Sequence, residues 1–525
     1  MRRARGGRRV QVPLALLLPA VAVVALALLP LVYLVLRAAG GGGHGLELLW
    51  RRNTLELLWS TGLLVVSVTA ASVAIGVTLA WLVTRTDLPG RRAWAVAAAL
   101  PLVIPSYVAA FCLLGALGPR GLAQQVLGVE RLPEIYGYWG ALAALTLSTY
   151  PYVLLLTSAA LRGVDPAQEE AARGLGTPAR EVFRRVTLPA VRPSIGAGAL
   201  LVALYTLSDF GVVSLMRYDA LTRAIYLQYR SLFDRAPAAV LALVLVALTA
   251  LVLLLEGRSR RRTHRSSPGV ARRLHPHPLG RWTLPALGFC AAVLGCFLVL
   301  PATVLVVWLA RGLERSDWPW SETLNSISAS ALAAGAAALA ALPVALLARR
   351  HPSRWTRLLE RLSFTGNALP GIVIALSLVF FAANYASPVY QTLALLVFAY
   401  VVRFLPQALA GVESSLAAVS PRVEEAARAL GRGPVVTTVT VTVPLIRSGI
   451  LAGAALVFLS AMKELPATLL LRPIGFDTLA TDIWRFTSVG AYSEAALPAL
   501  LLIAVSAPFV YLLSGRHEPE ATEHG

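Results

Sequence analysis

Long apolar runs alternate with short polar, arginine-rich segments along the whole chain. Each apolar run covers about 18 to 25 residues, enough for an α-helix rising about 1.5 Å per residue to cross a bilayer. We predict twelve membrane-spanning helices, six in each half of the chain. They lie near residues 11–36, 60–84, 94–117, 138–161, 194–216, 238–255, 284–310, 325–348, 365–383, 391–412, 448–470 and 495–514.

The first run follows the basic sequence MRRARGGRR and therefore resembles the start of a signal peptide. The run is long enough to span a bilayer, and no cleavage site of small residues follows it. We predict an uncleaved first helix. A content of 57% hydrophobic and 14% charged residues agrees with a membrane protein.

A polar segment occurs twice with nearly identical sequence. It is EEAARGLG at Glu169 to Gly176 and EEAARALG at Glu424 to Gly431, 255 residues later. The flanking sequence keeps this offset, which identifies an internal repeat. We predict an all-α polytopic membrane protein with two homologous six-helix halves. The predicted segments are a cytoplasmic N-terminus (1–11), a first half (12–256) with its loop (162–193), a basic linker (257–283), a second half (284–515) with its loop (413–447), and a cytoplasmic tail (516–525).

The arginines test this topology. If the N-terminus is cytoplasmic, the inside segments hold 32 arginines and the outside segments 13. This is the bias expected of cytoplasmic loops. The net charge of +20 therefore reflects topology and does not indicate a nucleic-acid partner. The basic linker is expected to lie against anionic lipid headgroups.

Each repeated loop is predicted to form two short helices. Asp165 and Ser420 are suited to the N-cap, with proline after each at N1. Gly176 and Gly431 are suited to the left-handed position that ends the first helix. A second helix then begins near Thr177-Pro178 in one copy and near Gly433-Pro434 in the other.

The apolar face of each short helix is mostly alanine. The residues on that face are Ala171, Ala172 and Leu175 in the first copy and Ala426, Ala427 and Leu430 in the second. An amphipathic helix lying on lipid would need larger side chains. Two small faces on the cytoplasmic side favour docking of a two-fold symmetric partner.

The loops resemble the EAA loop of ABC importer permeases, whose pattern is EAA, three residues, Gly, nine residues, a β-branched residue, one residue and Leu-Pro. The first copy fits at Glu170, Ala171, Ala172, Gly176, Val186, Leu188 and Pro189, and the second at Glu425, Ala426, Ala427, Gly431, Val441 and Pro444, with Val443 in place of leucine. In that family the loop is a coupling helix that inserts into the ATPase subunit. The resemblance implies ATPase-coupling roles for these residues and for the neighbouring Glu169 and Glu424.

The resemblance also implies partners. Two loops imply two copies of a cytoplasmic ABC ATPase, together with an extracytoplasmic solute-binding protein and a location in the bacterial inner membrane. The only lysine, Lys463, lies in AMKELPA without the glycine-rich turn of a P-loop. We therefore expect no enzyme activity and no cofactor in this chain, with ATP and Mg²⁺ bound by the partner ATPase.

Ionisable residues inside predicted spans are candidates for the translocation path, because a charge in hydrocarbon is costly. The candidates are Asp209, Lys463 and Glu464, and Asp209 and Glu464 are repeat equivalents that could face each other. An equal alternative is that Lys463 and Glu464 are structural and pair with carboxylate or backbone partners near the outer interface. Arg403 is interpreted as structural, with its stem reaching toward an interface. The pairs Ser194/Gly198 and Gly449/Gly453 suit close helix crossings.

The stretches 207–235 and 461–486 resemble the fused permeases of ferric-iron ABC importers. Related permeases serve thiamine or polyamines, so these substrates remain alternatives. A proton-coupled secondary transporter using the three candidate residues is an alternative of another class, and a non-transporting membrane scaffold is a third. No metal site is assigned. We interpret Cys112, Cys290 and Cys296 as small buried residues, and His264, His275 and His277 as linker residues without a metal.

Overall fold

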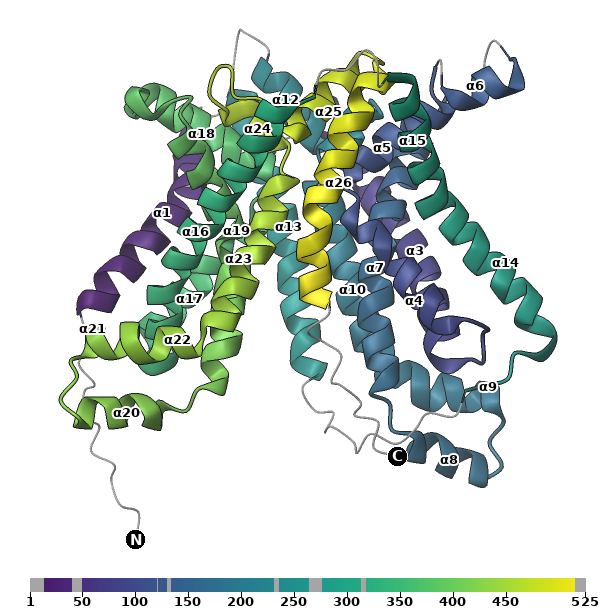
Figure 1. Ribbon diagram of the computed structural model, residues 1–525, viewed down its shortest axis with the longest axis horizontal. Coiled ribbons are helices and arrows are strands. Elements are labelled where there is room, and N and C mark those ends of the chain that lie inside the picture. The colour runs from purple at the N-terminus through teal and green to yellow at the C-terminus, as the bar shows by residue number, and fades with distance from the viewer. Residues whose placement is uncertain are drawn as a thin grey trace. The chain divides into compact units, whose positions relative to one another are not determined.

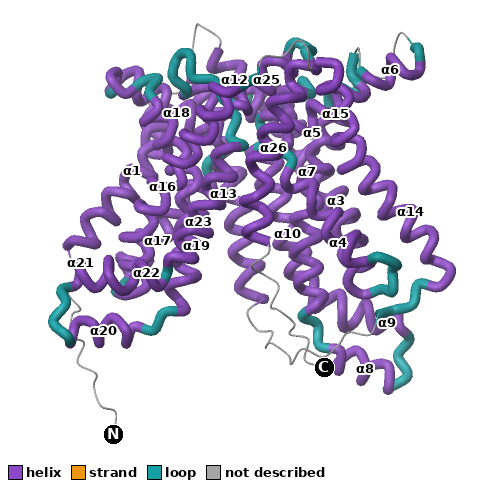
Figure 2. The backbone as a smooth tube through the Cα atoms, in the orientation of Figure 1, coloured by secondary structure: helices purple, strands orange, loops and turns teal. Residues whose placement is uncertain are grey.

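The computed structural model describes residues 14–39, 50–119, 121–129, 134–230, 236–263, 276–312 and 318–514. These residues form helices and connecting turns, with one isolated bridge between Thr86 and His277 and no strand in the described part (Figure 2). The predicted all-α class is confirmed. The predicted N-terminal segment 1–11, the tail 516–525, and His264 and His275 lie outside the described residues.

The chain divides into two compact units. The unit with the first EEAAR loop, here the first-loop unit, comprises residues 38–319 and 479–504. The second-loop unit comprises residues 1–37, 320–478 and 505–525. These units differ from the two halves of the repeat, because the opening helix of each half groups with the helices of the other half.

The first-loop unit is built around α3, α7 and α10, which pack on one another. Its helices are α3 (Arg52–Arg85), α4 (Arg91–Ala99), η1 (Leu100–Val103), α5 (Ser106–Leu117), α6 (Leu122–Leu127), α7 (Tyr138–Arg162), α8 (Pro166–Gly174), α9 (Ala179–Val182), η2 (Phe183–Thr187), α10 (Leu188–Ser208), α11 (Gly211–Leu215), α12 (Leu221–Arg230), α13 (Ala236–Thr263), η3 (Gly280–Trp282), α14 (Thr283–Leu294), η4 (Gly295–Val299), α15 (Leu300–Gly312) and α25 (Leu479–Ser488).

The second-loop unit has a corresponding centre of α16, α19 and α23. Its helices are α1 (Leu14–Ala39), α16 (Trp320–Arg350), α17 (Arg354–Ser363), η5 (Phe364–Ala368), α18 (Gly371–Tyr385), η6 (Ser387–Val389), α19 (Leu393–Ala418), α20 (Pro421–Ala429), α21 (Pro434–Thr437), η7 (Thr438–Thr442), α22 (Val443–Leu445), α23 (Arg447–Met462) and α24 (Pro466–Leu471). The last helix, α26 (Tyr492–Ser514), contributes residues to both units.

Ten described helices are long and apolar enough to cross a membrane, or twelve if each of two bent helix pairs is one span. The upper number matches the predicted twelve. Four predicted spans, near 94–117, 194–216, 365–383 and 448–470, contain breaks between shorter helices. Proline favours such breaks because it lacks a backbone N–H, and Pro105 and Pro370 directly precede α5 and α18.

The predicted small-residue crossings occur in both units. A Cβ added to Gly198 of α10 would lie 3.0 Å from Val153 Cα on α7. A Cβ added to Gly453 of α23 would lie 2.9 Å from the Ala408 carbonyl oxygen on α19. A Cβ added to Gly449 would lie closer still, against the Ser415 hydroxyl and the Gly411 carbonyl oxygen of α19. These glycines let the helix backbones approach one another, which confirms the structural interpretation.

The cysteine prediction was correct for two residues of three. Cys112 and Cys290 are buried, whereas Cys296 is exposed. Cys296 lies in the span 280–312, of which only 28% of the most apolar stretch is buried in the protein. One face of this span packs on the unit, and Cys296 is on another face.

Candidate functional site

The first helices of the two repeated loops, α8 and α20, begin as predicted (Figure 1). The Asp165 carboxylate accepts a hydrogen bond from the Ala167 N–H at 3.0 Å. The Ser420 hydroxyl accepts one from the Arg422 N–H at 3.4 Å. Proline follows each cap at the first helical position, where the missing N–H has no helical partner in any case.

Both helices end at a glycine in the left-handed conformation, with φ of +83° at Gly176 and +86° at Gly431. In the first loop Thr177 N–H donates to the Ala172 carbonyl at 3.1 Å, and Gly176 N–H donates to Arg173 at 2.9 Å. The same pair of hydrogen bonds recurs at Arg432 and Gly431 in the second loop. This is the Schellman arrangement, and the predicted end of each helix is confirmed.

The outer surface of each loop carries a glutamate and a leucine. Glu170 and Glu425 are exposed, and Leu175 and Leu430 are 86% and 84% exposed. Both leucines are therefore large apolar side chains at the tip of an exposed loop. Of the predicted coupling residues, Ala171, Gly176, Pro189, Ala426, Gly431 and Pro444 are also exposed, Ala172 is half-buried and Ala427 is buried.

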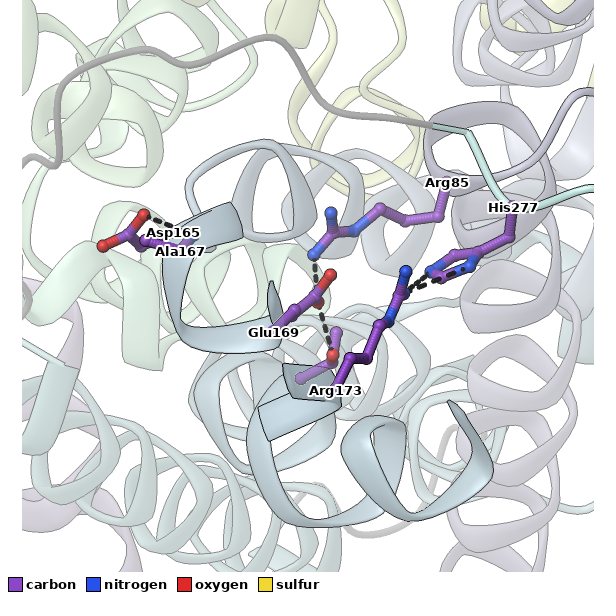
Figure 3. Close-up of polar contacts among 7 residues, drawn as sticks. Arg85, Asp165, Ala167, Glu169, Arg173 and His277 are labelled. Carbon is purple, nitrogen blue, oxygen red and sulfur yellow. Dashed lines mark hydrogen bonds and ion pairs between the residues drawn. The ribbon is translucent and has the colours of Figure 1, made fainter. Parts of the chain in front are cut away.

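The preceding glutamate of the first loop points inward. The Glu169 carboxylate accepts hydrogen bonds from Arg85 Nη2 and from the Thr187 hydroxyl, each at 2.6 Å (Figure 3). Glu169 and Arg85 are both buried, with exposed fractions of 6% and 2%. The helix α8 is thereby tied to the end of α3, and Glu169 is not available to a partner's surface.

The second loop has the same inward anchor. The Glu424 carboxylate accepts from Arg350 Nε at 2.9 Å and from the Thr442 hydroxyl at 3.1 Å. Thr187 and Thr442 each end a π-helical turn, η2 and η7, in equivalent places. Such turns occur frequently at functional sites.

Sequence reasoning missed the partners in this anchor, which are Arg85, Thr187, Arg350 and Thr442. The two threonines keep the 255-residue offset, so the repeat contained a signal for them. The two arginines lie 265 residues apart, because the first half has ten more residues between α5 and the middle of α7. A comparison at a constant offset cannot find them.

The linker residue His277 lies beside the first loop. Arg173 Nη2 lies 3.2 Å from its Nε2 (Figure 3). The imidazole ring also stacks on Trp81, with ring centroids 5.7 Å apart. His277 N–H also donates to the Arg85 carbonyl at 2.8 Å, and Asp87 N–H donates to the His277 carbonyl at 3.2 Å. Burial, and next the Arg173 guanidinium, lower the pKa of the imidazole from its usual 6.5.

The candidate translocation residues lie at breaks of the spans and cap the short helices that follow. Asp209 accepts from the Ser106 hydroxyl at 2.6 Å and from the Val212 N–H at 2.8 Å. Glu464 accepts from Arg403 Nη1 at 2.7 Å and from the Ala467 N–H at 3.3 Å.

The structural alternative for Glu464 therefore has support, with Arg403 as the partner and Lys463 next to it at the end of α23. The Arg403 side chain is turned to this carboxylate and is only 19% exposed, which agrees with its interpretation as a structural residue. Asp209 and Glu464 belong to different units, and their facing one another stays a prediction. Among the described residues no group of three His, Cys, Asp or Glu side chains could hold a metal.

Two segments of the chain, 72–265 and 329–521, match the family described as binding-protein-dependent transport system inner membrane component. The chain belongs to this family. Each match contains one EEAAR loop with its anchor, so the permease carries two family domains in one polypeptide. It is a multi-span inner-membrane transport subunit.

Several curated proteins resemble the permease. It is 34% identical to the Fe(3+)-transport system permease protein FbpB 2 of Haemophilus influenzae over 92% of this chain and 95% of the relative. It is 24% identical to the ferric transport system permease protein FbpB of Actinobacillus pleuropneumoniae over 77% of this chain and 63% of the relative. The molybdenum transport system permease protein ModB of Escherichia coli is 33% identical over 27% of this chain and 62% of the relative.

Proposed function

We propose that this permease translocates ferric iron as the membrane subunit of an ATP-driven importer. Iron would be delivered by an extracytoplasmic binding protein, and two copies of a cytoplasmic ATPase would bind ATP and Mg²⁺. Both chain termini would lie in the cytoplasm, as the arginine distribution favours. The supporting observation for iron is the 34% identity to an Fe(3+)-transport permease over 92% of the chain.

The geometry of the loops supports the proposed coupling. Exposed Glu170, Glu425, Leu175 and Leu430 would contact the ATPase, while buried Glu169 and Glu424 hold each coupling helix against its own bundle. Movement of an ATPase would then pull on α3 and α16 through the anchored loops. Asp209 and Glu464 cap helices at breaks, so we propose that they shape the path by positioning those helices.

Charge reversal tests the coupling proposal. Glu170→Lys combined with Glu425→Lys should abolish ATP-driven iron uptake by the assembled transporter but leave the permease in the membrane, because both side chains are exposed. The control is Glu56→Lys with Glu322→Lys, which reverses one charge near the start of α3 and one in the first turn of α16. Normal uptake by the loop variant, or equal loss in the control, would contradict the coupling role.

Competing functions give different results in the same assay. Accumulation of thiamine, a polyamine, sulfate or molybdate instead of iron would keep the mechanism and discard the substrate. Uptake driven by a proton gradient in vesicles without ATP would favour a secondary transporter. Absence of any solute flux with all partners present would favour a scaffold.

A further inference from the structure

A cavity of about 250 Å³ lies in the first-loop unit between α12 and α25. These two helices are at the opposite end of the unit from α8 (Figure 1). Helices α12 and α25 and the turn after α11 enclose the cavity. Its polar lining includes Arg217, Arg223, Tyr136, Tyr226, Ser214 and Thr487, and no Asp or Glu of the described residues lines it. Among the described residues the lining holds two guanidinium groups and no carboxylate, and the Asp219 carboxylate that Arg223 contacts lies outside the lining, so the lining itself is positive.

Arg217 occupies a position that normally belongs to glycine. Its φ is +54°, and it follows α11 with hydrogen bonds from Arg217 N–H to Ser214 at 3.1 Å and from Tyr218 N–H to Val213 at 2.8 Å. A helix end of this kind favours glycine because other L residues are strained there. The strained backbone places the guanidinium 4.7 Å from the centre of the Tyr136 ring, beside the cavity. Such strain often accompanies a functional site.

Two hydroxyl groups of the lining have no hydrogen-bond partner. Thr487 is 4% exposed, and its Oγ1 is buried without a partner. Ser214 Oγ is also buried without one. An unmet buried hydroxyl is destabilising. Both residues line the cavity, and rotation about χ1 would let either hydroxyl donate to a ligand oxygen there.

The repeat equivalent of Arg217 is arranged differently. Arg472 lies 255 residues later, has an extended backbone and precedes Pro473. It forms an ion pair with Asp477 within the second-loop unit. One copy of this arginine is thus neutralised by a carboxylate, and the other lines a cavity to which the described residues contribute none.

We infer that this cavity binds a small oxyanion. Arg217 and Arg223 supply the positive charge, and the hydroxyls of Thr487 and Ser214 donate hydrogen bonds to the anion. Arg223 also contacts Asp219 through Nη1, and the five N–H groups of a guanidinium serve both. The volume equals that of about eight water molecules at roughly 30 Å³ each, which accommodates a sulfate-sized ion with part of its hydration.

The test measures equilibrium binding of labelled sulfate to the full permease in lipid nanodiscs, without partners or iron. Saturable binding at one site, displaced by phosphate but not by equimolar chloride, is the expected result. Displacement by acetate as strong as by phosphate would identify carboxylates as natural ligands of the same site. Absent binding, or equal displacement by chloride, would overturn the proposal.

Variants locate the site. Arg217→Gly removes the guanidinium and supplies the residue that this backbone favours, so sulfate should bind at least about tenfold more weakly while the melting temperature does not fall. Thr487→Val should weaken binding roughly threefold. Arg52→Gln, which removes an exposed arginine of the same unit, should leave binding unchanged. Full binding by Arg217→Gly, or equal loss in Arg52→Gln, would place the anion elsewhere.

This experiment is independent of the proposed transport function. Failure to bind sulfate leaves the ferric-iron proposal intact, because iron uptake is not measured. Conversely, sulfate accumulation by the complete transporter would overturn iron as the substrate and leave the cavity assignment standing.

Discussion

The two EEAAR loops share an inner anchor and differ in the wall around it. In each loop a buried glutamate accepts hydrogen bonds from an arginine at the end of a long helix and from a threonine in a π-helical turn. Outside the anchor, the first loop borders a cavity of about 630 Å³ and the second one of about 140 Å³. The repeat therefore preserves how each loop is attached, and not what surrounds it.

Particular side chains account for the difference. Trp81 and Arg180 line the first cavity. Their repeat equivalents, Leu346 and Val435, line the second. Each cavity is also lined by one histidine and by the arginine of the EEAAR segment, but the two histidines come from different parts of the chain. His277 comes from the linker, whereas His351 directly follows α16. An anchor that must transmit motion needs fixed geometry in both copies, while the outer wall can include a segment from elsewhere in the chain.

Removal of the anchor should have the largest effect, and a larger one in the first loop. Glu169→Ala leaves Arg85 buried without its carboxylate, which should destabilise the loop by about 3–5 kcal/mol. Glu424→Ala should cost less, because Arg350 is more exposed and also donates to the Val419 carbonyl. Hydrogen exchange of α8 and α20 measures both effects.

Glu170→Ala is the control for this pair of variants, since it removes an exposed carboxylate one residue away. It should leave exchange of α8 unchanged. Equal loss of protection in Glu169→Ala and Glu424→Ala would show that the two anchors do not differ in their dependence on the glutamate.

Substitutions at the breaks in the spans should have an intermediate effect on stability, and they compare the surroundings of Glu464 with those of Asp209. A Cβ at Gly371 would lie 1.5 Å from Arg403 Nη1, so Gly371→Ala should displace this guanidinium from Glu464 and destabilise the permease by about 3 kcal/mol. Ser106→Ala removes one hydrogen bond to Asp209 and should cost about 1.5 kcal/mol. Thermal unfolding in detergent compares the two.

Gly335→Ala is the matched control, because a Cβ there would meet no atom within 4 Å on the same unit's α16. It should be neutral or raise the melting temperature, since alanine favours a helix over glycine. A loss as large as that of Gly371→Ala would mean that crowding at Arg403 is not the cause.

The smallest expected effect is the dependence on pH of the contact between linker residue His277 and the first loop. Groups facing His277 are Arg173, Arg85, Glu169 and Trp81, and burial followed by Arg173 lowers the pKa of its imidazole below 6.5. The imidazole therefore resists protonation while His277 is packed against the first loop. This packing should be most stable above pH 6.5 and become less stable as the pH falls through the lowered pKa. Exchange of the His277 and Asp87 amides, corrected for intrinsic rates, measures this by mass spectrometry.

His277→Gln supplies the comparison for the pH experiment. It keeps a polar side chain that does not titrate in this range, so exchange of the same amides should lose its dependence on pH. Retention of the full dependence in this variant would assign the effect to another group.

Local chemistry in the sequence was sufficient for the membrane class and for the ends of the loop helices. Apolar runs long enough to cross a bilayer predict spans, Asp165 and Ser420 are preferred caps, and Gly176 and Gly431 suit a left-handed end. Each of these features depends on residues close together in the chain, and the structure agrees with all of them. The coupling roles and the substrate remain proposals, because they depend on partners.

Tertiary structure alone decided which charges meet. Arg85 joins Glu169 across 84 residues, Arg403 joins Glu464 across 61, and His277 reaches Arg173 across 104. No periodicity connects such pairs, because they depend on where helices cross and on an unequal insertion between the halves. The same reason explains why the sequence predicted that Glu169 belongs to the coupling loop, whereas only the folded helices turn its carboxylate inward.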